Sequence, residues 1–307
     1  MKPIKLKPAV KDYIWGGTRL RDEYGIKTDL NPVAEAWMLS CHKDGESVAD
    51  GGEFHGMTLT SIIEKCGLDI LGEKAKQFDF FPILVKLIDA KGNLSIQVHP
   101  SDEYALENEG QYGKTEMWYV VDCDEGASLY YGFKEKISKE EFKTRIENDT
   151  ILEVLNKVPV QKGDCFFIES GTIHAIGEGL LIAEIQQNSN LTYRVYDYGR
   201  VGADGKPREL HVEKALKVTT LNEPTHKYGK LDTNILAECK YFTSEILELQ
   251  NTAKINVDSD SFVNLLCLEG EGKIEGVKFS KGESIFIPAN SGELELLGNA
   301  KLILSKV

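Results

Sequence analysis

Short apolar stretches separated by glycine-containing turns run along most of the 307-residue chain. The stretch 94–99 shows the pattern clearly, because apolar and polar residues alternate along it. Ile96 and Val98 would lie on one face of a strand. Ser95, Gln97 and His99 would then lie on the other face. With 28 glycines spread evenly along the chain, this pattern predicts a mainly β protein built from small antiparallel barrels.

Three stretches have the apolar spacing of helices instead: 60–78, 138–156 and 211–219. The second begins with Ser138 and Glu141, which have the spacing of a capping box. The segment 221–231 is polar and contains Pro224 and Gly229, so we predict a linker there.

An internal repeat organises the strands. The segment 162–169, Lys-Gly-Asp-Cys-Phe-Phe-Ile-Glu, resembles the segment 281–288, Lys-Gly-Glu-Ser-Ile-Phe-Ile-Pro, and an apolar stretch with an acidic-glycine turn precedes each copy. This order predicts two related jelly-roll barrels with a few helices packed at the side. We expect the domains 1–220 and 221–307, and residues 1–50 could pair with either barrel.

The two copies differ where the repeat ends. The first continues to His174, whereas the second continues through residues 289–292 without a histidine. If this turn carries a metal ligand, only the first barrel can bind a metal.

Four nitrogen and oxygen donors gather around the first copy in this interpretation. They are Gln97, His99, Glu116 and His174. This set suits Zn²⁺, although Mn²⁺ and Co²⁺ accept the same donors. It leaves room for water or substrate, which is typical of a catalytic site. In the alternative interpretation, His99 lies in a loop before Pro100, and Glu116 is only a solvated residue on a strand.

The formal net charge of −13 argues against nucleic acid as a partner, because a phosphate backbone requires a basic face. It also argues against binding to an anionic membrane surface. An anionic substrate would need a locally basic pocket. No apolar run approaches the length of a membrane span, and the N-terminus lacks the apolar segment of a signal peptide. The six cysteines form no C-x-x-C pair and are expected to be free thiols. We therefore expect a cytoplasmic protein.

The segment from Gly163 to His174 resembles the second cupin motif, G-x5-P-x-G-x-x-H, with Glu169 in place of the proline. The first cupin motif is only partly met. Gln97 stands where its first histidine would be, and Glu116 follows His99 at a distance.

Four further segments resemble the type I mannose-6-phosphate isomerases in their short bacterial form. They are 81–88 (Phe-Pro-Ile-Leu-Val-Lys-Leu-Ile), 94–100 (Leu-Ser-Ile-Gln-Val-His-Pro), 113–119 (Gly-Lys-Thr-Glu-Met-Trp-Tyr) and the stretch from His174 to Tyr198. Residues 14–17 and 34–37 fit as well. The chain departs from the family where Thr115 replaces the usual proline, and where Arg200 occupies a lysine position.

The resemblance implies a metal-dependent isomerase that interconverts mannose 6-phosphate and fructose 6-phosphate through a cis-enediol. It implies metal ligation by Gln97, His99, Glu116 and His174. Arg194, Glu184 and Lys114 become the candidate catalytic residues. Ser95, Lys86, Arg200, Trp15 and Glu35 become candidates for binding the sugar and its phosphate. The expected partner is a small sugar phosphate, and the expected state is a monomer or a weak homo-oligomer.

Two other functions stay open. A different cupin enzyme, such as an iron-dependent dioxygenase or a sugar epimerase, could use similar ligands, and a dioxygenase would consume oxygen. A non-catalytic sugar-binding cupin would be expected to have lost its metal ligands, which the first barrel keeps. The cationic residues 114, 194 and 200 favour a phosphorylated substrate.

Overall fold

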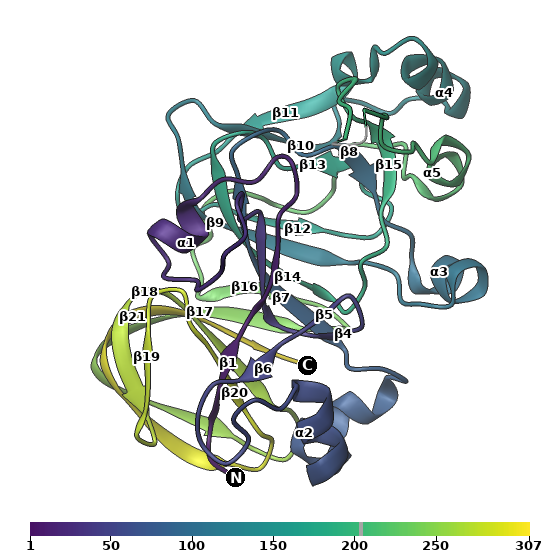
Figure 1. Ribbon diagram of the computed structural model, residues 1–307. Coiled ribbons are helices and arrows are strands. Elements are labelled where there is room, and N and C mark those ends of the chain that lie inside the picture. The colour runs from purple at the N-terminus through teal and green to yellow at the C-terminus, as the bar shows by residue number, and fades with distance from the viewer. Residues whose placement is uncertain (203–204) are drawn as a thin grey trace.

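The computed structural model describes residues 1–202 and 205–307, and it is mainly β, as the sequence predicts. Two sheets form the upper part of the molecule in Figure 1, drawn mainly in blue, teal and green, with the N-terminal strands of one sheet in purple. The six-stranded sheet has the order β12 (Cys165–Ile168), β9 (Glu116–Cys123), β14 (Leu180–Gln187), β7 (Ile83–Ala90), β3 (Glu35–Leu39) and β2 (Ala9–Lys11). The five-stranded sheet has the order β11 (Leu155–Pro159), β10 (Ser128–Phe133), β13 (His174–Ala175), β8 (Ile96–Val98) and β15 (Tyr193–Tyr196).

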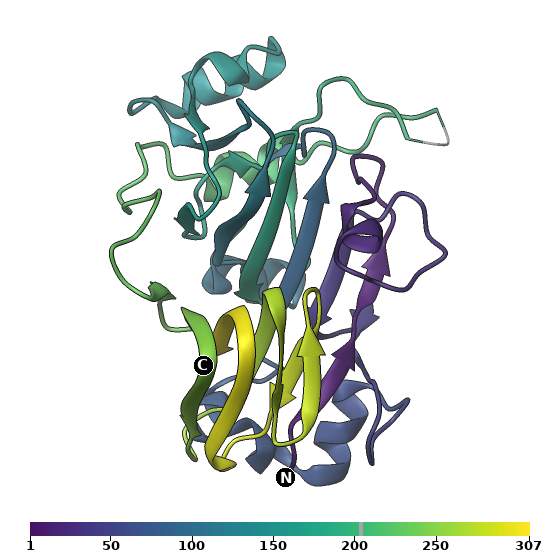
Figure 2. The same cartoon turned by 90° about the vertical axis from the view of Figure 1, so that its left-hand side faces the viewer.

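The C-terminal strands form most of an eight-stranded sheet. Its order is β16 (Ile235–Glu238), β17 (Thr243–Val257), β21 (Gly292–Lys306), β18 (Val263–Ile274), β20 (Ser284–Ile287), β1 (Ile4–Lys7) and β6 (Val48–Ala49), with β19 (Val277–Ser280) paired to β18. The N-terminal strand β1 therefore pairs with β20 of the C-terminal region, and Figure 2 shows it beside the yellow strands. A two-stranded sheet joins β4 (Cys41–His42) to β5 (Gly45–Glu46).

The internal repeat corresponds to two equivalent pairs of strands. β12 pairs antiparallel with β9, and Ile168 faces Glu116. β20 pairs antiparallel with β18, and Ile287 faces Val263. Ile168 and Ile287 occupy the same position of the repeat, so Val263 stands where the first copy has Glu116. The second copy thus differs at a second candidate metal ligand, besides the missing histidine.

The six-stranded sheet is buried on both faces, because alternate residues of its strands enter two different cores. Val85, Met117 and Ala183 pack in the core shared with the eight-stranded sheet. Trp118 and Ile182 lie in the core between the six- and five-stranded sheets. Because successive residues of a strand point to opposite faces, polar residues can lie between the six- and five-stranded sheets while their neighbours keep the other core apolar.

The predicted helix over 60–78 is wrong as a single element. The structure has α2 (Leu59–Cys66), followed by two 3₁₀ turns, η1 (Leu68–Leu71) and η2 (Glu73–Gln77). Gly67 and Gly72 separate the three pieces with φ of +89° and +87°. This backbone conformation ends a helix, and glycine adopts it without steric cost.

The other two helical predictions are confirmed in part. α4 (Lys139–Glu147) is capped by the Ser138 hydroxyl, which accepts a hydrogen bond from the Glu141 N–H. It ends earlier than expected, and a 3₁₀ turn, η3 (Ile151–Glu153), leads into β11. α5 (Val212–Val218) lies within the predicted 211–219. The sequence patterns missed two further short helices, α1 (Arg19–Asp22) and α3 (Asp102–Glu109).

All six cysteines lie in the described ranges and are free thiols, as expected. None of the helices in residues 1–202 and 205–307 is both long and apolar enough to cross a membrane.

The contact between the eight-stranded sheet and the rest of the chain provides a stability test. Phe262 is fully buried and stacks on Phe81, with the ring centroids 5.3 Å apart. Phe262→Ala should lower the free energy of unfolding by about 3–5 kcal/mol, because it leaves a cavity in the shared core. Urea unfolding would measure the loss. Phe80→Ala is the matched control, since Phe80 is 53% exposed and its loss should cost less than about 1 kcal/mol. Equal losses in the two variants would contradict this account of the core.

Candidate active site

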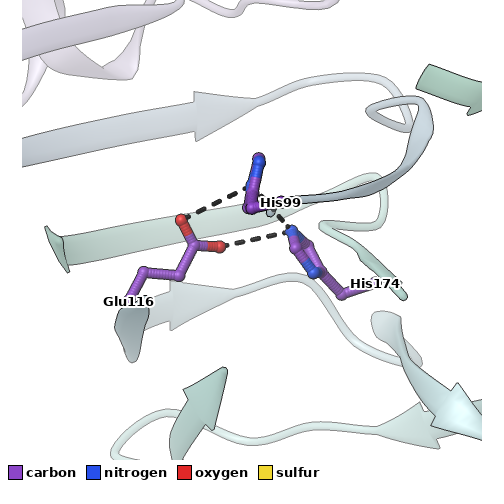
Figure 3. Close-up of side chains that lie close together, drawn as sticks. All are labelled: His99, Glu116 and His174. Atoms are coloured by element: carbon purple, nitrogen blue, oxygen red, sulfur yellow. Dashed lines mark hydrogen bonds and ion pairs between the residues drawn. The ribbon is translucent and has the colours of Figure 1, made fainter. Parts of the chain in front are cut away.

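Three candidate ligands come together from separate elements in the interior between the six- and five-stranded sheets. His99 follows β8, Glu116 begins β9 and His174 begins β13. Their ligand atoms all lie within 4.8 Å of one another, and all three side chains are buried. Figure 3 shows the Glu116 carboxylate pointing toward both imidazole rings. The fourth predicted ligand, Gln97, lies beside them, with its Nε2 3.4 Å from Nε2 of His174.

Backbone contacts fix the segments that carry these side chains. Gly171 has a φ of +90°, and its N–H donates to the His99 carbonyl at 2.8 Å. The Lys114 N–H donates to the Pro100 carbonyl at 3.1 Å. These bonds tie the loops on either side of the cluster to the His99 segment, so the ligands are held before any ion binds.

Each histidine uses its other ring nitrogen as a donor to the backbone. Nδ1 of His99 lies 2.8 Å from the Leu191 carbonyl, and Nδ1 of His174 lies 2.8 Å from the Thr172 carbonyl. A carbonyl only accepts, so both Nδ1 atoms carry the proton and both Nε2 atoms are unprotonated in the neutral rings. The two Nε2 atoms face each other at 3.2 Å. Two lone pairs this close repel unless a cation lies between or beside them.

Glu116 adds negative charge to these lone pairs. Its Oε1 is buried without a hydrogen-bond partner and lies 3.3 Å from Nε2 of His174. Its Oε2 accepts a hydrogen bond from the Lys114 ammonium, which also lies 3.3 Å from Nε2 of His99. Two imidazole nitrogens and an unpartnered carboxylate oxygen at one buried point are the donors of a divalent metal site. The residues present therefore fit a divalent metal ion.

The interior shifts the pKa values of these ligands. Burial, with the Lys114 charge, lowers the pKa of His174 to about 3 and that of His99 well below its usual range. Both rings are thus neutral near pH 7 and ready to act as ligands. Burial and the nearby Glu184 charge raise the pKa of Glu116 to about 7.

A cavity of about 260 Å³ lies beside the cluster and reaches it through Gln97 and Lys114. Fifteen residues line it: Tyr13, Trp15, Glu35, Lys86, Ile88, Leu94, Ser95, Gln97, Lys114, Ile176, Glu184, Asn190, Thr192, Arg194 and Arg208. Four of them are cationic and two are carboxylates, so the cavity is locally positive in a protein with a net charge of −13. Such a cavity can bind an anion despite the global charge.

Two carboxylates surround Lys86 at the floor of this cavity. Its ammonium lies 3.1 Å from Oε1 of Glu184 and 3.5 Å from Oε2 of Glu35. Burial would lower the pKa of Lys86, but these two carboxylates outweigh it and raise the pKa, so the lysine stays charged. Burial would likewise raise the pKa of Glu184, but Lys114 and Lys86 outweigh it and lower the pKa to about 2. Glu184 is therefore an ionised, buried carboxylate at the cavity.

Arginines occupy the opposite part of the cavity. Nε of Arg194 donates to the Ser95 hydroxyl at 3.3 Å, and Arg194 lies on β15 directly opposite Gln97 of β8. Arg208 also lines the cavity, and its guanidinium forms two bonds to the buried Asp197 carboxylate, at 2.8 and 2.5 Å. Arg200 binds the same carboxylate at 2.5 Å. Asp197 thus holds two guanidinium groups together.

The structure brings most of the predicted residues to this one place. Seven of the eight predicted catalytic and substrate-binding residues line the cavity: Trp15, Glu35, Lys86, Ser95, Lys114, Glu184 and Arg194. The eighth, Arg200, does not line the cavity. It binds Asp197, the carboxylate that also binds Arg208. Sequence reasoning missed Arg208, Tyr13 and Asn190. For Arg208, the only signal was its short sequence distance from Arg200.

A cupin fold with a buried His–Glu–His cluster beside a cation-lined cavity defines a cupin enzyme with a candidate metal centre. Comparisons with known proteins specify the family. Residues 4–125 match the model of the phosphomannose isomerase type I catalytic domain, and residues 232–307 match that of the mannose-6-phosphate isomerase cupin domain. The mannose-6-phosphate isomerase ManA of Bacillus subtilis is 39% identical over 99% of this chain and 98% of its own length. A mannose-6-phosphate isomerase of Streptococcus mutans is 35% identical over 99% of this chain and 98% of its own length.

Solved structures agree with this assignment. The crystal structure of the Bacillus subtilis mannose 6-phosphate isomerase covers 100% of both chains with a TM-score of 0.90 and 35% identity. The chain belongs to the type I mannose-6-phosphate isomerases. It is an aldose–ketose isomerase that interconverts mannose 6-phosphate and fructose 6-phosphate.

The raised pKa of Glu116 predicts how metal affinity depends on pH. Below about pH 7 the ion must displace a proton from Glu116, so affinity should fall by up to about tenfold per pH unit as pH decreases. The histidines release no proton in this range because they are already neutral. Calorimetric titration of chelator-treated protein with Zn²⁺, in buffers of different ionisation enthalpy, would measure the affinity and the protons released. The variant His226→Asn, at an exposed histidine, should give the same profile. An affinity that does not change between about pH 5.5 and pH 7 would contradict the assignment to Glu116.

Proposed function

We propose that the isomerisation uses one Zn²⁺ ion held by the four donors Gln97, His99, Glu116 and His174. The observation that carries this proposal is the cluster of unprotonated nitrogens and an unpartnered carboxylate oxygen beside the cavity. Gln97 would contribute its carboxamide oxygen, which requires its amide group to turn by about 180°, because the nitrogen Nε2 now faces His174. When bound, the ion would supply positive charge that stabilises the cis-enediolate.

Glu184 and Lys114 are the proposed proton-handling groups. The reaction moves one proton from C2 of the sugar to C1, so the chain must offer a group that accepts the proton and returns it. Both side chains line the cavity, and Lys114 Nζ lies 3.6 Å from Oε1 of Glu184. The low pKa shows that Glu184 is ionised, and it also makes this carboxylate a weak base. Proton transfer would therefore rely on the Lys114 charge to stabilise the negative charge that develops on the sugar oxygens.

Arg194 is proposed to stabilise the same developing charge from the opposite sheet. Its guanidinium is fixed by the Ser95 hydroxyl and by the Glu209 carbonyl at 2.9 Å. Burial and the neighbouring Arg208 charge lower the pKa of Arg194, but a guanidinium remains protonated in proteins. A charge held in place in this way needs little reorganisation during the reaction.

The phosphate is proposed to bind at Ser95 and Arg208, which both line the cavity. A guanidinium suits a phosphate dianion because its N–H groups can bond two oxygens at once. Lys86 adds a positive charge to the cavity lining. Arg200 would act indirectly, because it binds Asp197, which holds Arg208. Trp15 and Glu35 would then contact the sugar.

The remaining expectations are proposals as well. Six free thiols are typical of a reducing compartment, which supports a cytoplasmic enzyme. The proposed state of the enzyme is a monomer or a weak homo-oligomer.

Metal removal tests the central proposal. Prolonged chelation should abolish the conversion of mannose 6-phosphate, measured in a coupled assay, and added Zn²⁺ should restore it. Elemental analysis of the purified enzyme should find one zinc per chain. If turnover persists after the metal has been removed, the metal centre has no catalytic role. If another divalent ion alone restores activity, the metal role stands and the identification of zinc is wrong.

Arg208→Ala tests the phosphate site. It should raise KM for mannose 6-phosphate by about tenfold or more and weaken inhibition by inorganic phosphate to a similar extent, because a charge-assisted bond is lost. Arg145→Ala is the control, since Arg145 lies on α4 and pairs with Glu153 outside the cavity. An unchanged KM in a folded Arg208→Ala enzyme would place the phosphate elsewhere.

A further inference from the structure

Four residues form a continuous line across the six-stranded sheet. Trp37 of β3 pairs with Lys86 of β7, Lys86 pairs with Glu184 of β14, and Glu184 pairs with Trp118 of β9. Residues directly opposite each other on neighbouring strands project from the same face. All four side chains are buried, and the two tryptophans, at the ends of the line, are fully buried.

Each tryptophan of this line donates its indole N–H to a carboxylate that flanks Lys86. Nε1 of Trp118 donates to Oε2 of Glu184 at 2.8 Å. Nε1 of Trp37 donates to Oε2 of Glu35 at 2.7 Å. The two oxygens of Glu184 are therefore held from different sides, Oε2 by Trp118 and Oε1 by the ion pair with Lys86.

Trp118 is well suited to hold this carboxylate. Its ring is fixed in the core between the two sheets and meets the His174 ring edge-on, with the ring centroids 5.2 Å apart. An indole N–H donates one hydrogen bond and accepts none, so it cannot take up the proton that the reaction moves. Trp118 does not line the cavity, whereas Glu184 does. Any effect of the indole N–H on substrate must therefore pass through another residue.

We propose that Trp118 is a positioning residue for the isomerisation, because its indole N–H holds the Glu184 carboxylate in its reactive orientation. This inference rests on the proposed role of Glu184 in proton transfer. Trp118 supplies no group to the substrate. The indole N–H holds Oε2 of Glu184, so the carboxylate cannot rotate to turn this oxygen toward Lys114 or Lys86. Glu184 therefore keeps a single orientation. Proton transfer depends strongly on such alignment, whereas ground-state binding of the sugar phosphate depends on Arg208 and Ser95.

Trp118→Phe is the direct test, because it keeps an aromatic ring and removes the N–H. We expect kcat to fall by about tenfold or more, since the hydrogen bond is made to a charged group. KM should stay within about twofold and metal content should stay complete, since no group that binds phosphate or metal has changed. Tyr131→Phe is the matched control. It removes a buried O–H, which donates to the Phe167 carbonyl at 2.6 Å in the same core, and should leave turnover unchanged.

A double-mutant cycle shows whether Trp118 acts through Glu184. In a Glu184→Gln enzyme, adding Trp118→Phe should cause no further loss of kcat. The same fold-loss in both backgrounds would overturn the inference, and so would a loss of kcat that parallels a loss of metal, since the effect would then pass through His174. Wild-type kcat in a folded Trp118→Phe enzyme, together with an impaired Glu184→Gln enzyme, would overturn the Trp118 inference alone. Wild-type kcat in Glu184→Gln would overturn the proposed role of Glu184, and the inference with it.

A spectroscopic measurement covers the case in which Trp118→Phe does not fold. In holoenzyme with ¹⁵N-labelled indoles, Glu184→Gln should shift the Nε1–H resonance of Trp118 more than that of Trp37, because only Trp118 donates to Glu184. Trp37→Phe and Trp15→Phe would assign the three resonances. An unshifted Trp118 resonance would show that the bond does not exist in solution and would overturn the inference.

Discussion

The interior between the six- and five-stranded sheets contains three carboxylates, two lysines and two neutral histidines, all of them buried. They are Glu35, Glu116, Glu184, Lys86, Lys114, His99 and His174. Burying one such charge alone would cost several kcal/mol, a large share of the net stability of a folded protein, so alternating charges that each have a partner are strongly favoured. Their alternation is visible in the distances: Lys86 lies between Glu35 and Glu184, and Lys114 lies between Glu184 and Glu116. The chain of charges is incomplete at one end, where Glu116 Oε1 and Nε2 of His174 face each other with no proton between them, and a divalent ion would complete it there.

This requirement explains why the site is built on strands that are buried on both faces. In β7, β9 and β14, one set of alternate residues packs against the eight-stranded sheet, and the other set carries the charged groups. The outer packing fixes the backbone, and the register then fixes which charges meet. A slip of one residue would turn Lys86 or Glu184 into the apolar core. The fully buried Trp37 and Trp118 donate their neutral indole N–H groups to Glu35 and Glu184, so these two carboxylates need no further cation.

Local patterns in the sequence predicted a good part of this arrangement. Alternation in 94–99 placed Ser95 and Gln97 on one face, and both line the cavity. The repeat predicted two equivalent strand pairs, and the strand register confirms them. The helix over 60–78 failed because apolar spacing at 3.6 residues did not account for Gly67 and Gly72, whose left-handed conformation interrupts it. Arg208 was missed because a lone arginine in a polar loop has no periodicity to mark it, and only its contact with Asp197 shows its place.

The sequence by itself determined the strand pattern, the repeat and the types of donor and charge that the enzyme has available. These follow from the residue types and their spacing, which act over a few neighbouring residues. The tertiary structure alone decided which of them share a site. It placed Glu184 between Lys86 and Trp118, placed Arg208 rather than Arg200 at the cavity, and turned the unprotonated nitrogens of His99 and His174 toward Glu116. Pairing of strands far apart in the chain sets these contacts, and the free energy of burying charges selects the pairing in which each charge finds a partner.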